Sequence, residues 1–139
     1  MFNHKLIFEN QMFKAGMTIP ANAKTDAPTA VRVGGIPNRL AVTVVTKTET
    51  KITAAKKITI TLTECDTEAG SFAAPTANPS MVVTMSATTP PAQTIYAIGD
   101  RIASLVLPEN IGKWVKASIT TDDTGATGTI DVFLEYLGV

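Results

Sequence analysis

The sequence predicts an all-β protein, an antiparallel β-sandwich built as one domain. About one residue in six is threonine, and valine and isoleucine are abundant, which suits pleated, half-buried strands. Short runs of this kind are separated by Gly, Pro, Asn or Asp at the intervals of a sandwich. Runs of helical periodicity never exceed two turns. A chain of 139 residues has the size of a single core.

Residues 1–28 are expected to form an extended N-terminal arm, and residues 29–139 the sandwich domain. The first part of the arm is apolar, and residues 14–28 are rich in Ala, Gly, Pro, Asn and Thr, as in a flexible leash. Two interpretations stay open: the arm packs on its own domain as a first strand, or it reaches a neighbouring subunit. Its apolar residues are candidates for a subunit interface: Phe2, Leu6, Ile7, Phe8 and Phe13.

Seven runs along residues 29–139 are predicted strands. Their ranges are 30–33, 39–46, 57–64, 80–87, 102–107, 113–121 and 127–137. In 57–64 the residues Ile58, Ile60 and Leu62 share one face while Lys and Thr occupy the other, so this strand is half buried. Residues 40–45 are apolar on both parities, which indicates cover on both faces by the core and by a partner or loop. Residues 65–78 and 88–99 are expected loops.

The last two runs are expected to pair as a hairpin through residues 121–126, a loop of Thr, Asp, Gly and Ala. Pairing Thr120 with Thr127 places Trp114 opposite Phe133 on the outer face, and a register two residues away places Trp114 opposite Glu135. Such an outward aromatic pair is a further candidate interface. Three roles are open: contact with another subunit, cover by the chain's own loops, or stacking on a sugar.

Composition argues against several classes of function. Twelve basic residues balance twelve acidic ones, so we expect no nucleic-acid partner and no attachment to an anionic membrane. The longest apolar run is too short to cross a bilayer. Cys65 is the sole cysteine, which excludes an internal disulfide and is consistent with folding in a cytoplasm.

Residues able to perform catalysis or hold a metal are few. His4 is the sole histidine, and it lies in the arm, the least rigid place for a catalytic group. The acidic clusters at 64–68 and 122–123 lack the spacing of a calcium loop. We therefore expect no enzyme activity, no cofactor and no metal site.

The motifs of the second half of the chain recur in one known group of proteins. They are Gly99-Asp100 leading into a strand that ends at Leu107-Pro108, the aromatic-led strand from Trp114 to Ile119, the Thr127-Gly128 loop into the final strand to Leu134, and upstream Ile58 to Leu62 followed by Ser71-Phe72. In these motifs the chain resembles the Bbp16-like capsid cement proteins of tailed phages. Residues 1–28 match no motif of that family.

The resemblance implies a jelly-roll sandwich that forms homotrimers and clamps the major capsid protein on the outer surface of a virion. It also implies that the N-terminal segment takes part in trimer or capsid contacts, and it brings no catalytic residue. The expected fold is thus a jelly-roll-like antiparallel β-sandwich with an extended N-terminal arm, and the expected function is capsid decoration. Two alternatives are a carbohydrate-binding module, for which aromatic residues are scarce, and a phage tail-tube or head-completion subunit.

Overall fold

The computed structural model describes residues 12–33, 39–75, 80–84 and 93–137. Within these ranges the chain forms strands, turns and loops, and no α-helix. The expected all-β class is confirmed. The strands are β1 (Met12–Thr18), β2 (Lys24–Asp26), β3 (Val31–Arg32), β4 (Leu40–Thr46), β5 (Thr50–Thr53), β6 (Lys57–Cys65), β7 (Ser80–Thr84), β8 (Gln93–Tyr96), β9 (Arg101–Val106), β10 (Trp114–Thr121) and β11 (Thr129–Tyr136).

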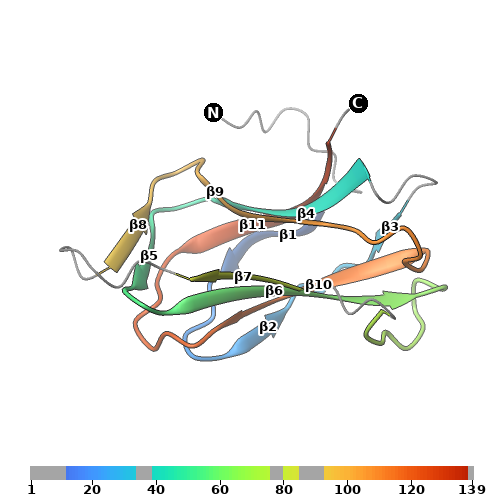
Figure 1. Ribbon diagram of the computed structural model, residues 1–139, viewed down its shortest axis with the longest axis horizontal. Helices are drawn as coiled ribbons and strands as arrows, with labels where there is room; N and C mark the ends of the chain where they lie inside the picture. Colours follow the sequence, from blue (N-terminus) through green and yellow to red (C-terminus); the bar gives the residue numbers. More distant parts are fainter. Residues whose placement is uncertain (1–11, 34–38, 76–79, 85–92, 138–139) are drawn as a thin grey trace.

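Two antiparallel sheets lie face to face in the described part of the chain (Figure 1). The upper sheet in Figure 1 has the strand order β1-β11-β4-β9, and the lower sheet has the order β2-β10-β6-β7, with β3 also paired to β10. Strands β5 and β8 form a separate two-stranded sheet at one end. The two principal sheets bury their facing sides against each other, as in other sandwiches.

The eight principal strands pair in a nested order. Taking β1, β2, β4, β6, β7, β9, β10 and β11 in sequence, the first pairs with the eighth, the second with the seventh, the third with the sixth and the fourth with the fifth. A long antiparallel hairpin that is rolled up on itself has this order. The short strands β3, β5 and β8 are additions to it.

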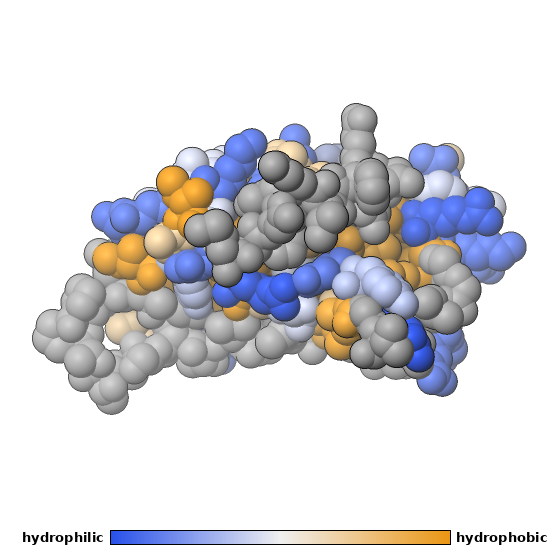
Figure 2. Space-filling view, turned by 90° about the horizontal axis from the view of Figure 1, so that it is seen from above, coloured by the Kyte–Doolittle hydropathy of each residue, from blue (hydrophilic) through white to orange (hydrophobic). Residues whose placement is uncertain are grey.

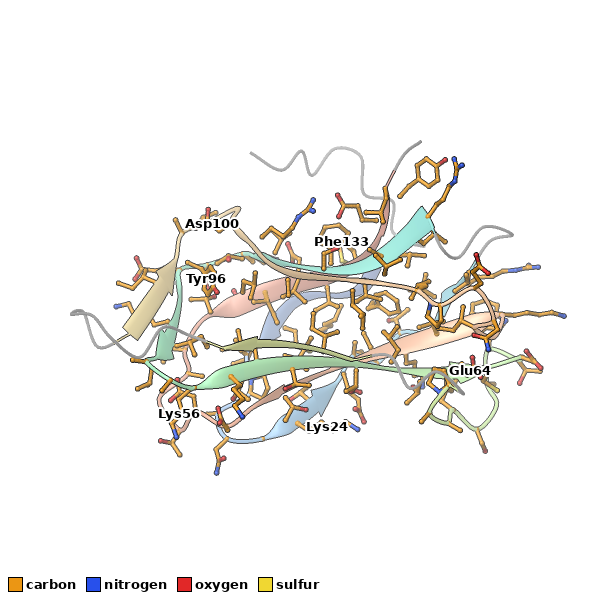
Figure 3. All side chains as sticks on the ribbon, in the orientation of Figure 1. Lys24, Lys56, Glu64, Tyr96, Asp100 and Phe133 are labelled. Carbon is orange, nitrogen blue, oxygen red and sulfur yellow. The ribbon has the colours of Figure 1, made fainter. Side chains whose placement is uncertain are left out.

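The core lies between the two sheets and follows the alternation of side chains along each strand (Figure 3). In β6, Ile58, Ile60 and Leu62 are buried while the threonines between them are half-buried, as predicted. In β10, Val115 and Ile119 face the same core. The upper sheet contributes Val42 and Val44 of β4, with Ile130, Val132 and Leu134 of β11.

The predicted hairpin between the last two runs is wrong. Strand β10 pairs with β2, β3 and β6, whereas β11 pairs with β1 and β4, so the two strands belong to opposite sheets. The intervening turn carries the chain across the sandwich, and Gly128 at its end has φ +120°. A Cβ atom at Gly128 would lie 2.7 Å from the carbonyl oxygen of Glu49, so glycine is required there.

The expectation of a leash over residues 14–28 is also corrected. Strand β1 pairs with β11, and β2 pairs with β10, so both belong to the principal sheets and the sandwich begins before residue 29. The hydroxyl of Ser118 donates a 2.6 Å hydrogen bond to the carboxylate of Asp26, which fixes β2 to its neighbour. Of the two interpretations of the arm, packing on its own domain holds for residues 12–28. Residues 1–11 lie outside the described part of the chain.

Each of the seven predicted strands overlaps an observed strand, with ends that differ by a few residues. Strands β2, β5 and β8 were not predicted. Strand β8 lies within the expected loop 88–99, and its register with β5 places Thr50 opposite Tyr96. Both strands are four residues long, too short for an alternating pattern to stand out from a loop.

Candidate functional site

The structure separates the residues that were predicted to form a subunit interface. Phe2, Leu6, Ile7 and Phe8 lie outside the described residues. Phe13 is fully buried and belongs to the core, so it is not an interface residue in this chain. Its side chain sits on β1, whose pairing with β11 turns it inward.

Trp114 and Phe133 do not form the predicted outward pair. Both face away from the core, as the alternation of their strands requires, but they lie on opposite sheets. Trp114 is half-buried beside Arg32 and Cys65 on the lower sheet. Phe133 lies between Met12 and Thr43 on the upper sheet and is 1% exposed. Figure 3 shows Phe133 on the upper sheet.

We define the outer face as the side of the β1-β11-β4-β9 sheet that is turned away from the core. On β4 it carries Ala41, Thr43 and Val45, and on β11 it carries Asp131, Phe133 and Glu135. The three β4 residues are fully buried. This burial on both parities of β4 confirms the sequence-based prediction that the strand is covered on both sides.

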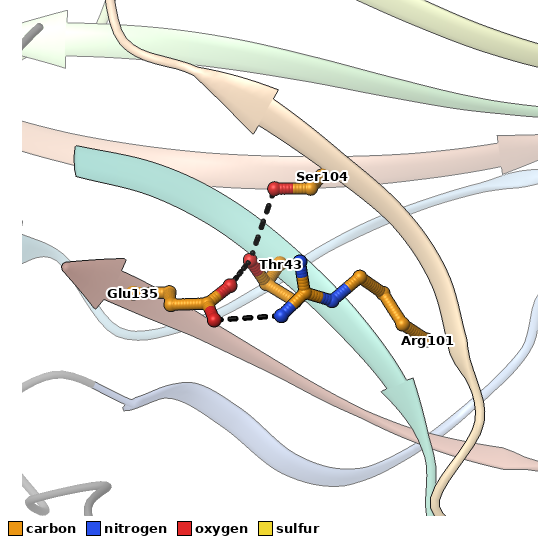
Figure 4. Close-up of polar contacts among 4 residues, drawn as sticks. All are labelled: Thr43, Arg101, Ser104 and Glu135. Atoms are coloured by element: carbon orange, nitrogen blue, oxygen red, sulfur yellow. Dashed lines mark hydrogen bonds and ion pairs between the residues drawn. The ribbon is translucent and has the colours of Figure 1, made fainter. Parts of the chain in front are cut away.

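A polar cluster crosses three strands of the outer face (Figure 4). The hydroxyl of Thr43 donates a 2.7 Å hydrogen bond to Oε2 of Glu135 and lies 3.3 Å from the hydroxyl of Ser104. Nη2 of Arg101 donates to Oε1 of Glu135 at 2.7 Å. Both carboxylate oxygens of Glu135 are therefore engaged, and the cluster fixes the positions of β9, β4 and β11.

An exposed apolar patch lies at the end of the same sheet. We call it the rim patch and define it as Val106, Tyr136 and Leu137, which are 48%, 50% and 44% exposed. Val106 pairs with Ala41, Tyr136 pairs with Leu40, and the amide of Leu137 donates to the carbonyl of Arg39. Three adjacent chain segments thus bring large apolar side chains to one edge. Figure 2 shows the molecule from above, with hydrophobic residues in separate areas among hydrophilic ones.

A second apolar spot lies around β8. Ile95 is 45% exposed, and Ile98, in the turn that follows, is 73% exposed. The turn is built by Asp100, whose carboxylate accepts a 2.9 Å hydrogen bond from the amide of Ala97, and by Gly99 at φ +89°. The sequence analysis missed both apolar spots, because it assigned Ile98 to a loop and Tyr136 and Leu137 to a strand end. The sequence held one indication of these spots, since Ile98 and Leu137 each directly precede a glycine, where a strand or loop turns and a side chain is easily exposed.

The carboxylates of Asp122 and Asp123, one of the two acidic clusters, accept hydrogen bonds from backbone amides. Oδ1 of Asp122 accepts the amide of Lys57, and the two oxygens of Asp123 accept the amides of Thr53 and Gly125, all at 2.7–2.8 Å. Burial raises the pKa of Asp123, but these amide donors outweigh it, so that its pKa is lowered. These residues hold the turn that joins the two sheets.

The lower sheet carries a shallow polar hollow of about 400 Å³. Lys24 and Asp26 line one side, 3.6 Å apart, while the ammonium of Lys116 lies 4.6 Å from the ring centre of Phe72. The hydrogen bond from Ser118 is the main cause that lowers the pKa of Asp26. A single aromatic ring in this hollow does not make the coplanar aromatic platform that a sugar-binding face would present.

Groups that could bind a metal do not gather in the described ranges: no three His, Cys, Asp or Glu side chains come together there. Cys65 is half-buried, and hydrogen bonds from Thr67 lower its pKa. Among the described residues, no helix is long and apolar enough to cross a membrane.

Comparison with known proteins gives no assignment. A scan against models of protein families found no family that matches the chain, and a search of curated proteins found no match.

Proposed function

We propose that this chain is a virion structural protein, a capsid decoration or cement protein that binds the major capsid protein and stabilises the shell. The observation that carries the proposal is the rim patch, in which Val106, Tyr136 and Leu137 present large apolar side chains on adjacent segments. Contiguous exposed apolar side chains are typical of surfaces that bind other proteins. The sequence motifs shared with phage capsid cement proteins suggest which class of partner this is, a major capsid protein.

The nested pairing of the eight principal strands supports the jelly-roll part of this proposal. Jelly rolls are double-sheet sandwiches of eight strands and are common in viral capsid proteins. A fold of this kind offers a rigid body, and the polar cluster around Glu135 further fixes the strands beside the rim patch.

In the proposed mechanism the protein forms a homotrimer on the outer surface of the capsid and contacts several capsid subunits at once. A stable interface usually buries about 800 Å² on each partner, and the rim patch supplies only part of that area. Three copies held together make the later contacts intramolecular, so weak individual contacts add up to firm attachment. Reinforcement of the shell then needs no chemical step.

The test is the mass of the purified full-length protein in solution, measured by light scattering. A trimer supports the proposal. A variant with Tyr136→Ser and Leu137→Ser should then have the mass of a monomer in solution while keeping its fold. A double substitution on the lower sheet, Thr59→Ser with Thr61→Ser, is the matched control and should stay trimeric. A monomer at every concentration would contradict self-assembly and favour the carbohydrate-binding or tail-subunit alternatives.

A further inference from the structure

The polar hollow on the lower sheet is built by three strands and one loop. Its floor is the side of β10 and β6 that is turned away from the core, where Lys116 lies opposite Thr63 and Ser118 lies opposite Asp26 of β2. Strand β2 and the two residues after it line one side, and the loop after β6 contributes the ring of Phe72. Segments distant in sequence therefore bring charged, hydroxyl and aromatic side chains into one concave place.

Two ammonium groups line the hollow together with one carboxylate. Lys24 and Lys116 carry the positive charges, and Lys24 lies on the side of the sheet turned away from the core (Figure 3). The carboxylate of Asp26 is already engaged, since it accepts the hydroxyl of Ser118 at 2.6 Å and lies 3.6 Å from the ammonium of Lys24. Lys116 forms no ion pair with any residue that the structure describes. One positive charge in the hollow is therefore not neutralised by the described chain.

The ammonium of Lys116 is held in place. It lies 4.6 Å from the ring centre of Phe72, a cation–π contact, and its side chain is half-buried. A side chain that is already ordered loses little freedom when it binds a ligand. The pKa of Asp26 is lowered chiefly by the hydrogen bond from Ser118. The positive charges of Lys24 and Lys116 lower that pKa further, so both charges act within the hollow.

We propose that this hollow binds a small ligand through a single carboxylate, which the ammonium groups of Lys116 and Lys24 hold. The hydroxyl of Thr63, opposite Lys116, is a further donor on the same side of the sheet. The rings of Phe72 and Pro28 offer apolar surface to the body of the ligand. Charged donors give the strong hydrogen bonds of such a site, and the apolar lining favours a ligand that carries more than the carboxylate alone.

Charge and size restrict the ligand. The lowered pKa of Asp26 keeps it ionised at neutral pH, so a group with two negative charges is repelled more strongly than a carboxylate. The volume of about 400 Å³ is near the lower end of ligand sites, about 300–1,000 Å³. A free organic acid and a glutamate side chain of another protein carry this same chemistry. The inference is independent of the proposed capsid function, since the rim patch lies on the upper sheet.

The experiment is a titration of the isotope-labelled full-length protein with sodium butyrate, followed by the shifts of its amide signals. Ionic strength is kept constant, because exposed charges are screened by salt. We expect saturable shifts at residues 63, 116 and 118 with a Kd on the order of 1 mM. Inorganic phosphate, the comparison probe, should bind at least about fivefold more weakly because of its second charge. Shifts that do not saturate by about 100 mM butyrate, or phosphate binding as tight as butyrate, would overturn the proposal.

Lys116→Gln tests the residue that holds the carboxylate. Loss of its charge should weaken butyrate binding by about tenfold, as for a charge-assisted hydrogen bond. Lys113→Gln is the matched control, because Lys113 is exposed just before β10 and makes the same change of charge away from the lining of the hollow. Butyrate should bind this variant as it binds the unchanged protein. Equal affinities of the two variants would overturn the proposal, since attraction to the net charge of the protein would then explain the shifts.

A pair of short peptides with blocked ends separates the two sources of the carboxylate. One peptide carries a central glutamate, and its partner carries glutamine at the same place. Binding of the glutamate peptide more tightly than butyrate assigns the hollow to a side chain of another protein, and the reverse order assigns it to a free organic acid. Equal binding of the two peptides at the hollow would overturn the proposal. None of these measurements involves a capsid, so their failure is distinct from failure of the proposed function.

Discussion

The two outward sides of the sandwich differ more than the two inner ones. On the lower sheet, β6 alternates strictly: Ile58, Ile60 and Leu62 are buried, and the threonines between them are partly exposed. On the upper sheet, every residue of β4 is buried. The same antiparallel architecture thus holds one sheet that faces solvent and one that is covered on both sides. The difference indicates that the upper sheet is the better candidate for a functional surface, and the polar cluster and the rim patch also lie there.

Phe133→Ala should have the largest effect on stability, because it removes a fully buried ring from the outer face. We expect a loss of about 3–5 kcal/mol in the free energy of unfolding, as for a large-to-small change in a core. Thr61→Ala on the open side is the control and should change it by less than about 0.5 kcal/mol. Chemical denaturation measures both. A loss below about 1 kcal/mol for Phe133→Ala would mean that the upper sheet is open to solvent as well.

Asp123→Ala should have the next largest effect, because it removes a buried carboxylate that accepts hydrogen bonds from the amides of Thr53 and Gly125. The expected loss is about 1–3 kcal/mol in the free energy of unfolding. Asp122→Ala, which removes one exposed hydrogen bond to Lys57, is the milder control. Equal losses for the two variants would show that the turn between the sheets does not depend on Asp123.

The same carboxylate predicts a pH dependence. Its pKa in the folded protein is lowered from the ordinary value of 3.8, so its ionised form is favoured by folding. The contribution is present above the unfolded pKa and is lost as pH falls through the folded pKa. Unfolding curves recorded from neutral to acid pH should show a smaller acid-induced loss in Asp123→Asn than in the unchanged protein. Identical pH profiles would contradict this account of the turn.

Thr43→Val should weaken the polar cluster of the outer face, because Glu135 then loses one of its two donors while the volume of the side chain is kept. The expected loss is about 1 kcal/mol in the free energy of unfolding. Thr59→Val on the open side is the matched control and makes the same chemical change without the partner. If both variants were equally stable, the polar cluster would contribute nothing to the free energy of unfolding.

Tyr136→Ser with Leu137→Ser should have the smallest effect on the stability of one chain, within about 0.5 kcal/mol each, because both side chains are already half exposed. The double substitution should instead disrupt the trimer, which light scattering would detect as a fall in the mass of the protein in solution. A large fall in stability with unchanged mass would assign the rim patch to the fold and remove the observation on which the proposed function depends.

Much of the fold could be predicted from local pattern. The alternation in 57–64 gave the buried side of β6, and the apolar run 40–45 indicated cover on both faces of β4. Which strands pair with each other in a sheet could not be predicted from local pattern. Strands β10 and β11 are neighbours in sequence and have matching periods, yet they lie on opposite sheets, because the turn between them crosses the sandwich instead of reversing within one sheet.

The candidate site was predicted less well than the fold. Period-two alternation showed that Trp114 and Phe133 face away from the core, but it carries no information on which sheet holds each residue or what covers it. Phe13 looked like part of a free arm because the glycine and alanine that follow it resemble a leash. In the structure Gly16 has φ +63°, and its amide donates to Asp131, so this stretch is an irregular strand. The rim patch depends on contacts between segments distant in sequence.

The central claim is that this chain binds a capsid, and sedimentation tests it most directly. Purified full-length protein would be mixed with empty capsids assembled from the major capsid protein of the same virus, and the pelleted fraction measured. The account predicts saturable binding at a fixed ratio to capsid subunits, lost in Tyr136→Ser with Leu137→Ser and kept in Thr59→Ser with Thr61→Ser. A protein that stays in the supernatant at every concentration, while its fold is intact, would contradict the claim.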